Sequence, residues 1–202
     1  LDAAMISHGD NDHAGGWGTV SRAFPVASLL APEGSPVPGI VPCRAGQSWQ
    51  WDGVRIRVLH PGDGFPYLGN EASCVLVVDS AHGRALLPGD IGEVVERRLL
   101  RDPAPLRAQV VVVGHHGSSG SSSPAFVAAT GARLALVAAG QGNRFGHPRA
   151  EVVQRWREQG AEVLGTPGSG AIRVWRDEER MAVRERRPWR ARLWDRREVP
   201  AM

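Results

Sequence analysis

The sequence predicts a single layered α/β domain. Short runs of β-branched and aliphatic residues alternate with windows of helical periodicity, which is the pattern of a sheet covered by helices. The chain has 202 residues, of which 42% are hydrophobic, and this is enough to bury one sizeable core. Polar clusters follow several of the predicted strands, and such positions converge on one crevice in α/β sheets. We therefore expect one domain with its site at one end of a sheet.

Eleven short apolar runs, bounded mostly by Gly, Pro, Asp or Ser, are expected to form strands. They are residues 3–7, 26–30, 48–52, 54–59, 73–78, 84–87, 108–113, 134–138, 162–164, 171–175 and 181–184. Asp52 and Gly53 separate two of these runs, and this pair is typical of a two-residue hairpin turn.

Three windows are expected to form helices, namely residues 93–100, 124–130 and 148–159. Ser123 precedes the second window as a cap, and Pro124 occupies its first helical position. The third window ends at Gly160, and its Val152 and Trp156 share one face, as a helix that packs on a sheet requires.

Composition narrows the class of protein. No run of about 18 apolar residues and no export leader is present, so we expect this chain neither to span a membrane nor to carry its own signal. All 24 basic residues are arginines and the net charge is +3, which is compatible with a polyanionic partner. Cys43 and Cys74 fit neither a metal pair nor a redox motif; they are two buried thiols or one disulfide, and the thiols are favoured.

The segment from His8 to His13 is the most informative part of the chain. It places four metal-binding side chains, those of His8, Asp10, Asp12 and His13, within six positions just after a predicted strand. Imidazoles and carboxylates this close together repel or compete for space unless a cation holds them. The alternative, a turn rich in Asp and Asn with ordinary surface charges, explains the arrangement poorly. The segment therefore predicts metal binding.

Three more polar clusters each follow a predicted strand. The first ends at Asp90, the second contains His115 and His116, and the third contains His147 before Pro148. Together with the first segment, this ordered set is far more specific than any one of its parts.

The ordered set resembles the metallo-β-lactamase superfamily, whose motif is His-x-His-x-Asp-His; Asp10 stands where the second His is usual. The downstream order is similar to the C-terminal hydrolase domain of the DNA-uptake competence proteins of the ComEC type. The resemblance implies an αββα sandwich, here without its N-terminal strands. We assign residues 1–183 to that domain and residues 184–202 to an Arg- and Trp-rich tail.

The resemblance also implies two divalent metal ions. The matching positions are His8 and Asp10 for the first metal, Asp12 and His13 for the second, Asp90 as the bridge, and His147 as the last ligand of the second metal. A shared carboxylate offsets the repulsion between two neighbouring cations.

The first metal position is expected to be rich in oxygen ligands. Asn70 lies where the superfamily usually supplies another His, and Asp10 also replaces a His. Oxygen ligands favour harder cations, so we expect Mn²⁺ rather than Zn²⁺, although Zn²⁺ is an alternative. No small organic cofactor is expected.

Asp12, His115 and His116 are the expected catalytic residues, with one histidine assisting the leaving group. Asn70, Ser118 and Ser119 are expected to contact substrate phosphate. A flexible surface loop is the competing interpretation of the serine-rich stretch.

The expected function is a metal-dependent nuclease that hydrolyses DNA phosphodiesters with a metal-activated hydroxide during DNA uptake. The resemblance places it on the periplasmic side of a bacterial inner membrane, attached to the membrane portion of a longer protein. One alternative is a hydrolase of small phosphodiesters or esters with the same fold. Another is a DNA-binding module without catalytic activity.

Four other residues have simpler interpretations. His60 and His82 occur in turns and are expected at the surface, while Glu93 and Glu96 are expected on an exposed helix face.

In the tail, Arg side chains interleave with Trp189 and one further tryptophan. This composition suits a nucleic-acid backbone, and a frayed, solvated end is an equal alternative.

Overall fold

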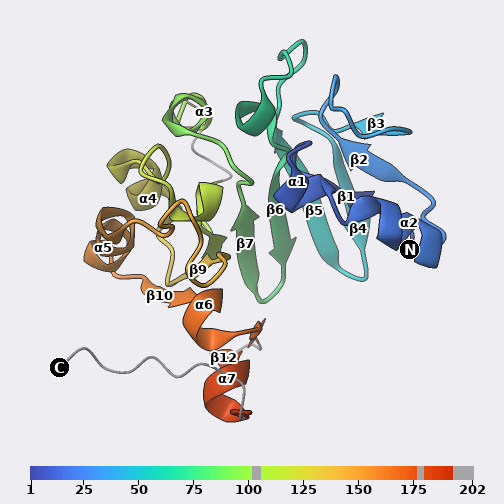
Figure 1. Ribbon diagram of the computed structural model, residues 1–202. Helices are drawn as coiled ribbons and strands as arrows, with labels where there is room; N and C mark the ends of the chain where they lie inside the picture. The colour runs from blue at the N-terminus through green and yellow to red at the C-terminus, as the bar shows by residue number, and fades with distance from the viewer. Residues whose placement is uncertain (102–105, 177–179, 193–202) are drawn as a thin grey trace.

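The structure is a computed structural model that describes residues 1–101, 106–176 and 180–192 (Figure 1). Its strands are β1 (Ala4–Met5), β2 (Leu29–Ala31), β3 (Val41–Pro42), β4 (Ser48–Trp51), β5 (Val54–His60), β6 (Val75–Ser80), β7 (Gly83–Leu87), β8 (Val110–Val112), β9 (Leu134–Val137), β10 (Glu162–Gly165), β11 (Ile172–Arg176) and β12 (Met181–Glu185). Its helices are α1 (Asn11–Ala14), α2 (Trp17–Ala23), α3 (Glu93–Leu99), α4 (Pro124–Thr130), α5 (Ala150–Glu158), α6 (Thr166–Ser169) and α7 (Arg186–Trp189), with 3-10 turns at Gly69–Ala72 and Gly114–Gly117.

A seven-stranded mixed sheet forms the centre of the molecule, in the order β10-β9-β8-β7-β6-β5-β4. Pairing is parallel from β10 to β7 and antiparallel from β7 to β4. Asp52 and Gly53 both have left-handed φ values, 47° and 81°, as a tight turn between β4 and β5 requires. The predicted hairpin is confirmed.

Helices α3, α4 and α5 cover one face of this sheet (Figure 1). Parallel strands need crossover connections, and α4 and α5 provide them between β8 and β9 and between β9 and β10. Val75 and Val77 of β6 point to this side, where they share one buried cluster with Val95, Phe126 and Trp156 of the three helices. All three predicted helices exist, although α5 begins at Ala150 rather than at Pro148.

The opposite face of the sheet packs on a small parallel sheet, ordered β1-β2-β3. Val58 of β5 is buried between the two sheets with Cys43 and Cys74. The two cysteines form a disulfide, so our expectation of two separate thiols was wrong. Packing of the two sheets brings their Cα atoms to 6.1 Å, which a separation of 31 positions in sequence could not indicate.

Short helices α1 and α2 cover the outer face of the small sheet. Ala14 and Trp17 pack there against a buried cluster that includes Ile6 and Leu29. The layers therefore run helix, sheet, sheet, helix, and the αββα architecture is confirmed. The sequence did not predict α1 and α2, because neither contains a run with helical hydrophobic periodicity.

Strands β11 and β12 near the C-terminus form a separate two-stranded sheet. The division predicted at residue 184 falls inside β12, which pairs with β11. The Arg184 guanidinium lies over the rings of Trp175 and Trp189, at 5.4 and 4.5 Å from their centroids. The last ten residues of the predicted tail, 193–202, lie outside the described residues. Among the described helices, none is long and apolar enough to cross a membrane.

Two side chains expected at the surface are buried. His60, at the end of β5, donates its Nε2 hydrogen to the Glu71 carbonyl at 2.8 Å. Glu96 of α3 is 1% exposed, and its carboxylate accepts the backbone N–H groups of Ser122 and Ser123 at 2.5 and 2.8 Å. Burial raises the pKa of Glu96. The expectations for His60 and Glu96 were wrong, because their partners come from segments distant in sequence.

We expect Glu96→Ala to lower the free energy of unfolding by about 2 kcal/mol or more, because two backbone N–H groups would lose their acceptor. Urea denaturation monitored by circular dichroism measures this. Glu93→Ala is the matched control on the same helix. Glu93 is exposed and, among the described residues, its carboxylate pairs with Arg97 one turn away, so its loss should cost at most about 0.5 kcal/mol. Equal losses in both variants would contradict the assignment.

Candidate metal centre

The four polar clusters meet at one end of the two sheets. They follow β1, β7, β8 and β9, and the last three strands are parallel neighbours whose carboxyl ends lie together. The side chains surround a pocket of about 680 Å³. Its lining is Gly9, Asp10, Asn11, Asp12, Asn70, Asp90, His115, His116, Arg144, Phe145 and His147.

His8 shows how the site is prepared for a cation. The Ser73 hydroxyl donates to the Asn70 carbonyl at 2.7 Å, so it accepts from His8 Nδ1, which lies 3.3 Å away. The Nδ1 proton leaves a lone pair on Nε2, which is buried without a hydrogen-bond partner among the described residues. This Nε2 lies 3.7 Å from Asp10 Oδ2. A buried imidazole nitrogen that has no hydrogen-bond partner and faces a carboxylate is the arrangement expected of a metal ligand.

Asp90 is the buried carboxylate at the centre. Its two oxygens lie 3.4 Å from His13 Nε2 and 3.3 Å from His116 Nε2. Burial alone would raise the pKa of Asp90, but hydrogen bonds from the two histidines outweigh it and hold the pKa below its usual range. Gly89 precedes Asp90 at φ 62°, and a Cβ there would stand 2.7 Å from Ser73 Cβ, so glycine is required.

His116 is held on both ring nitrogens. Nδ1 donates to the Ala138 carbonyl at 2.7 Å, and Nε2 lies 3.3 Å from Asp12 Oδ2 and 3.2 Å from His13 Nε2. The hydrogen bond to Asp90 raises the pKa of His116 to about 9. His115 and His116 both have left-handed φ values, 49° and 53°, a conformation that costs about 1–3 kcal/mol and is typical of functional sites.

Two overlapping groups of side chains could each hold a metal ion in the described part of the chain. They are His8, His13 and Asp90, and Asp12, His13 and His116, with ligand atoms of each group within 4.8 Å of one another. Nitrogen and carboxylate oxygen donors in this number suit divalent cations such as Zn²⁺ or Mn²⁺. The residues therefore fit the metals that the sequence predicts.

Other expected site residues line the pocket without joining these groups. Asn70 Nδ2 donates to His115 Nε2 at 3.3 Å. The His147 ring lies 6.0 Å from the His115 ring, and it is His116 that faces Asp12 and Asp90. Burial, aided by the charge of His115, lowers the pKa of His147.

The expected phosphate-binding serines lie outside the pocket lining. The Ser118 N–H donates to the His115 carbonyl at 2.9 Å, and the Ser118 hydroxyl accepts from Gly120 at 3.4 Å. Ser119 is exposed. The structure thus gives Ser118 a part in shaping the turn that carries the two histidines.

Two residues that the sequence did not single out, Ser7 and Tyr67, support or border the site. Ser7 Oγ lies 3.2 Å from His8 Nδ1 and 2.9 Å from His13 Nδ1. Tyr67, the only tyrosine in the chain, accepts the Gly9 N–H at 2.9 Å. Isolated hydroxyls carry no signal in spacing or periodicity, although Ser7 stands directly before the motif.

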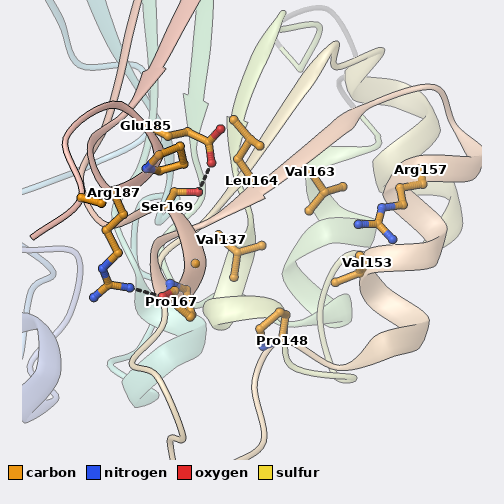
Figure 2. A pocket seen from close by; sticks show the side chains of 14 residues that line it. Val137, Pro148, Val153, Arg157, Val163, Leu164, Pro167, Ser169, Glu185 and Arg187 are labelled. Carbon is orange, nitrogen blue, oxygen red and sulfur yellow. Dashed lines mark hydrogen bonds between the residues drawn. The ribbon is translucent and has the colours of Figure 1, made fainter. Parts of the chain in front are cut away.

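A larger pocket, of about 770 Å³, lies between α5, β10 and the C-terminal segment (Figure 2). Aliphatic side chains such as Val153 form most of its wall. Two of its charged side chains form bonds within the chain: Glu185 accepts from the Ser169 hydroxyl at 2.5 Å, and Arg187 donates to the Pro167 carbonyl. The candidate site is therefore the smaller pocket with the clustered imidazoles.

Comparisons with known proteins agree with this geometry. A sequence model of the metallo-beta-lactamase superfamily matches residues 1–141. Recombination protein 2 of Haemophilus influenzae is 31% identical over 96% of this chain, and Competence protein ComA of Neisseria gonorrhoeae is 36% identical over 85% of it. The chain spans 25% of the length of each of these relatives. A mutant of CmlA beta-hydroxylase, 12% identical, shares the fold over 82% of this chain and 43% of its own, with a TM-score of 0.59.

The raised pKa of His116 predicts how the metal-free protein responds to pH. A folded-state pKa of about 9, above the usual 6.5, stabilises the fold fully below pH 6.5, and this contribution is lost as pH rises through about 9. Urea denaturation of chelator-treated protein at pH 6, 7.5 and 9.5 should show the decline, and His116→Gln should flatten it. His82→Gln, at an exposed histidine, should keep the wild-type slope. An unchanged slope in His116→Gln would contradict the assignment.

Proposed function

Because the chain belongs to the metallo-β-lactamase superfamily, we propose that it is a two-metal phosphodiesterase that hydrolyses DNA. The observation that carries this proposal is the convergence of His8, His13 and His116, whose Nδ1 atoms are held by protein oxygens while their Nε2 atoms face the carboxylates of one pocket. The names of the relatives, a recombination protein and a competence protein, support DNA as the substrate.

The proposed ligand set follows the distances between side chains. His8 and Asp10 would hold the first metal, Asp90 would bridge, and the second metal would be held by Asp12, His13 and His116. This set keeps every ligand expected from the sequence except His147, which His116 replaces. His147 then remains in the pocket beside His115 as a group that faces substrate.

When bound, the two cations would offset the negative charge of the phosphodiester and lower the pKa of water for attack on phosphorus. The chain itself orients the groups around them. Asp12 would help to position the attacking water, since its carboxylate is 63% exposed at the mouth of the pocket. His115, whose Nε2 accepts the Asn70 side-chain N–H, would present its Nδ1 hydrogen to an oxygen of the scissile phosphate.

We propose Mn²⁺ as the preferred metal. Asp10 and Asp12 contribute carboxylates, and Asn70 lies near the first position without an imidazole. Oxygen donors weaken the preference for Zn²⁺ and suit a cation that must also accept phosphate oxygens.

We also propose that the domain works on the periplasmic side of the inner membrane, joined to a membrane portion of a longer protein. The Cys43–Cys74 disulfide supports an oxidising compartment. The match covers only 25% of the competence protein and of the recombination protein, each of which is therefore more than three times as long as this chain.

A cleavage assay tests the function directly. Metal-loaded protein is incubated with end-labelled single- and double-stranded DNA, with Mn²⁺, Zn²⁺ or Mg²⁺ added in turn after chelation. We expect cleavage with Mn²⁺, and a loss of at least 10³-fold in the Asp12→Ala/His13→Ala double variant, since one metal position loses two ligands. Activity restored only by Zn²⁺ would overturn the metal assignment. Binding without cleavage would favour a DNA-binding module, and hydrolysis of small esters alone would favour another hydrolase of this superfamily.

The metal content of two variants distinguishes the role of His116 from that of His147. Elemental analysis should find two Mn²⁺ per chain in the wild type and in His147→Ala, but about one in His116→Ala, because His116, unlike His147, lies 3.3 Å from both Asp12 and Asp90 in the described residues. Circular dichroism confirms that each variant is folded. Loss of metal in His147→Ala with retention in His116→Ala would restore the ligand set expected from the sequence.

A further inference from the structure

The loop between β9 and α5 places an exposed aromatic side chain at the wall of the metal pocket. Phe145 is 55% exposed and stacks on His147, with ring centroids 5.8 Å apart and an interplanar angle of 15°. The Arg144 guanidinium lies 4.7 Å from the centroid of the Phe145 ring. The metal centre uses neither side chain.

The loop is held in place by its own hydrogen bonds. Asn143 Nδ2 donates to the carbonyls of Gly140 and His147, at 2.9 and 2.6 Å, and Asn143 Oδ1 accepts the His147 N–H at 3.0 Å. The Phe145 ring is therefore presented by a defined turn, which lowers the entropic cost of using it to bind a ligand.

A side pocket of about 270 Å³ opens beside Phe145 and next to the metal centre. It is lined by Asp12, His116, Ala138, Ala139, Gly140, Asn143, Phe145 and His147. Small apolar residues form one part of the wall and an aromatic face forms another, while Asp12 and His116 belong to the proposed metal site. A flat apolar group attached to the reacting phosphate would reach this pocket.

The charged side chains around the metal pocket indicate what chemical group is joined to the flat apolar group in the side pocket. Asp10, Asp12 and Asp90 contribute carboxylates to the metal pocket, and Arg144 is the one arginine among the described residues that line it. It is exposed beside the Phe145 ring, where it can reach a second phosphate of the same strand. A planar base next to a phosphate is the repeating unit of a nucleic-acid strand.

We propose that Phe145 stacks on a nucleobase adjacent to the scissile phosphate, with that base in the side pocket, and that Arg144 binds the neighbouring phosphate. This inference rests on the proposed nuclease function and specifies its substrate as single-stranded DNA. Bases in a duplex are stacked on each other and cannot offer a face to Phe145, whereas bases of a single strand can.

Abasic DNA tests the stacking contact. Fluorescein-labelled oligothymidylate is compared with a strand of equal length in which the central residues carry no base. Wild-type Mn²⁺-loaded protein should cleave the phosphodiesters beside bases roughly tenfold faster than those in the abasic stretch. Phe145→Ala should abolish the preference, so that phosphodiesters beside bases and those in the abasic stretch are cleaved at equal rates. Phe145→Trp should retain the preference.

Phe24→Ala is the matched control, because Phe24 is also 55% exposed but lies at the end of α2 outside both pockets. It should behave as the wild type. Arg144→Gln should weaken binding to both strands equally and reduce the salt slope of log Kd by about 0.7, with Arg55→Gln, at an exposed residue of β5, as its control.

Fluorescence anisotropy measures binding of the same two strands, and it distinguishes a failure of the nuclease function from a failure of the Phe145 stacking contact. If wild-type protein cleaves both strands at equal rates, or if Phe145→Ala slows both equally, the stacking proposal is overturned while the nuclease function stands. If no DNA is cleaved, the nuclease function fails. Binding of the intact strand that is roughly tenfold tighter than that of the abasic strand, and lost in Phe145→Ala, would then still support the stacking contact.

Discussion

One hydroxyl group connects the three segments on which the metal centre depends. Ser73 Oγ donates to the Asn70 carbonyl, accepts the backbone N–H of Asp90 at 3.0 Å, and contacts His8 Nδ1 at 3.3 Å. The turn before β6, the end of β7 and the end of β1 therefore share one small group. Because Gly89 has no Cβ, the Asp90 backbone can approach it closely. The positions of the Asp90 carboxylate and of the His8 imidazole follow from this contact.

The same arrangement is costly for the protein without its metals. His8 keeps an unpaired buried nitrogen, and two consecutive histidines adopt left-handed backbone conformations. In the described residues, the buried Asp90 carboxylate accepts hydrogen bonds from His13 and His116, and the bond to His116 raises the pKa of that imidazole. In the proposed metal site a cation would displace this proton, so metal binding and the stability of the fold would be linked. The αββα layers tolerate this cost because the polar clusters lie at strand ends and the site histidines and carboxylates belong to none of the three apolar clusters.

Much of the fold could be predicted from residue patterns. Alternation along β6, the Asp52–Gly53 turn and the helical face around Trp156 are local signals, and each has its expected counterpart in the structure. Burial of Glu96 and pairing of Cys43 with Cys74 could not be predicted in this way. Both depend on partners more than 20 positions away, which only packing of the layers brings into contact.

The sequence by itself determined which ligand types the site offers: imidazoles and carboxylates are crowded between His8 and His13, and the resemblance of their order with Asp90 to the metallo-β-lactamase superfamily implies divalent metal ions. Only the tertiary structure decided which groups face each other. It set His116 against Asp12 and Asp90, left His147 beside His115, and brought Phe145 to the wall of the same pocket. The physical reason is that ligand type is a property of single residues. Distance and direction are set by parallel strands whose ends meet at one edge.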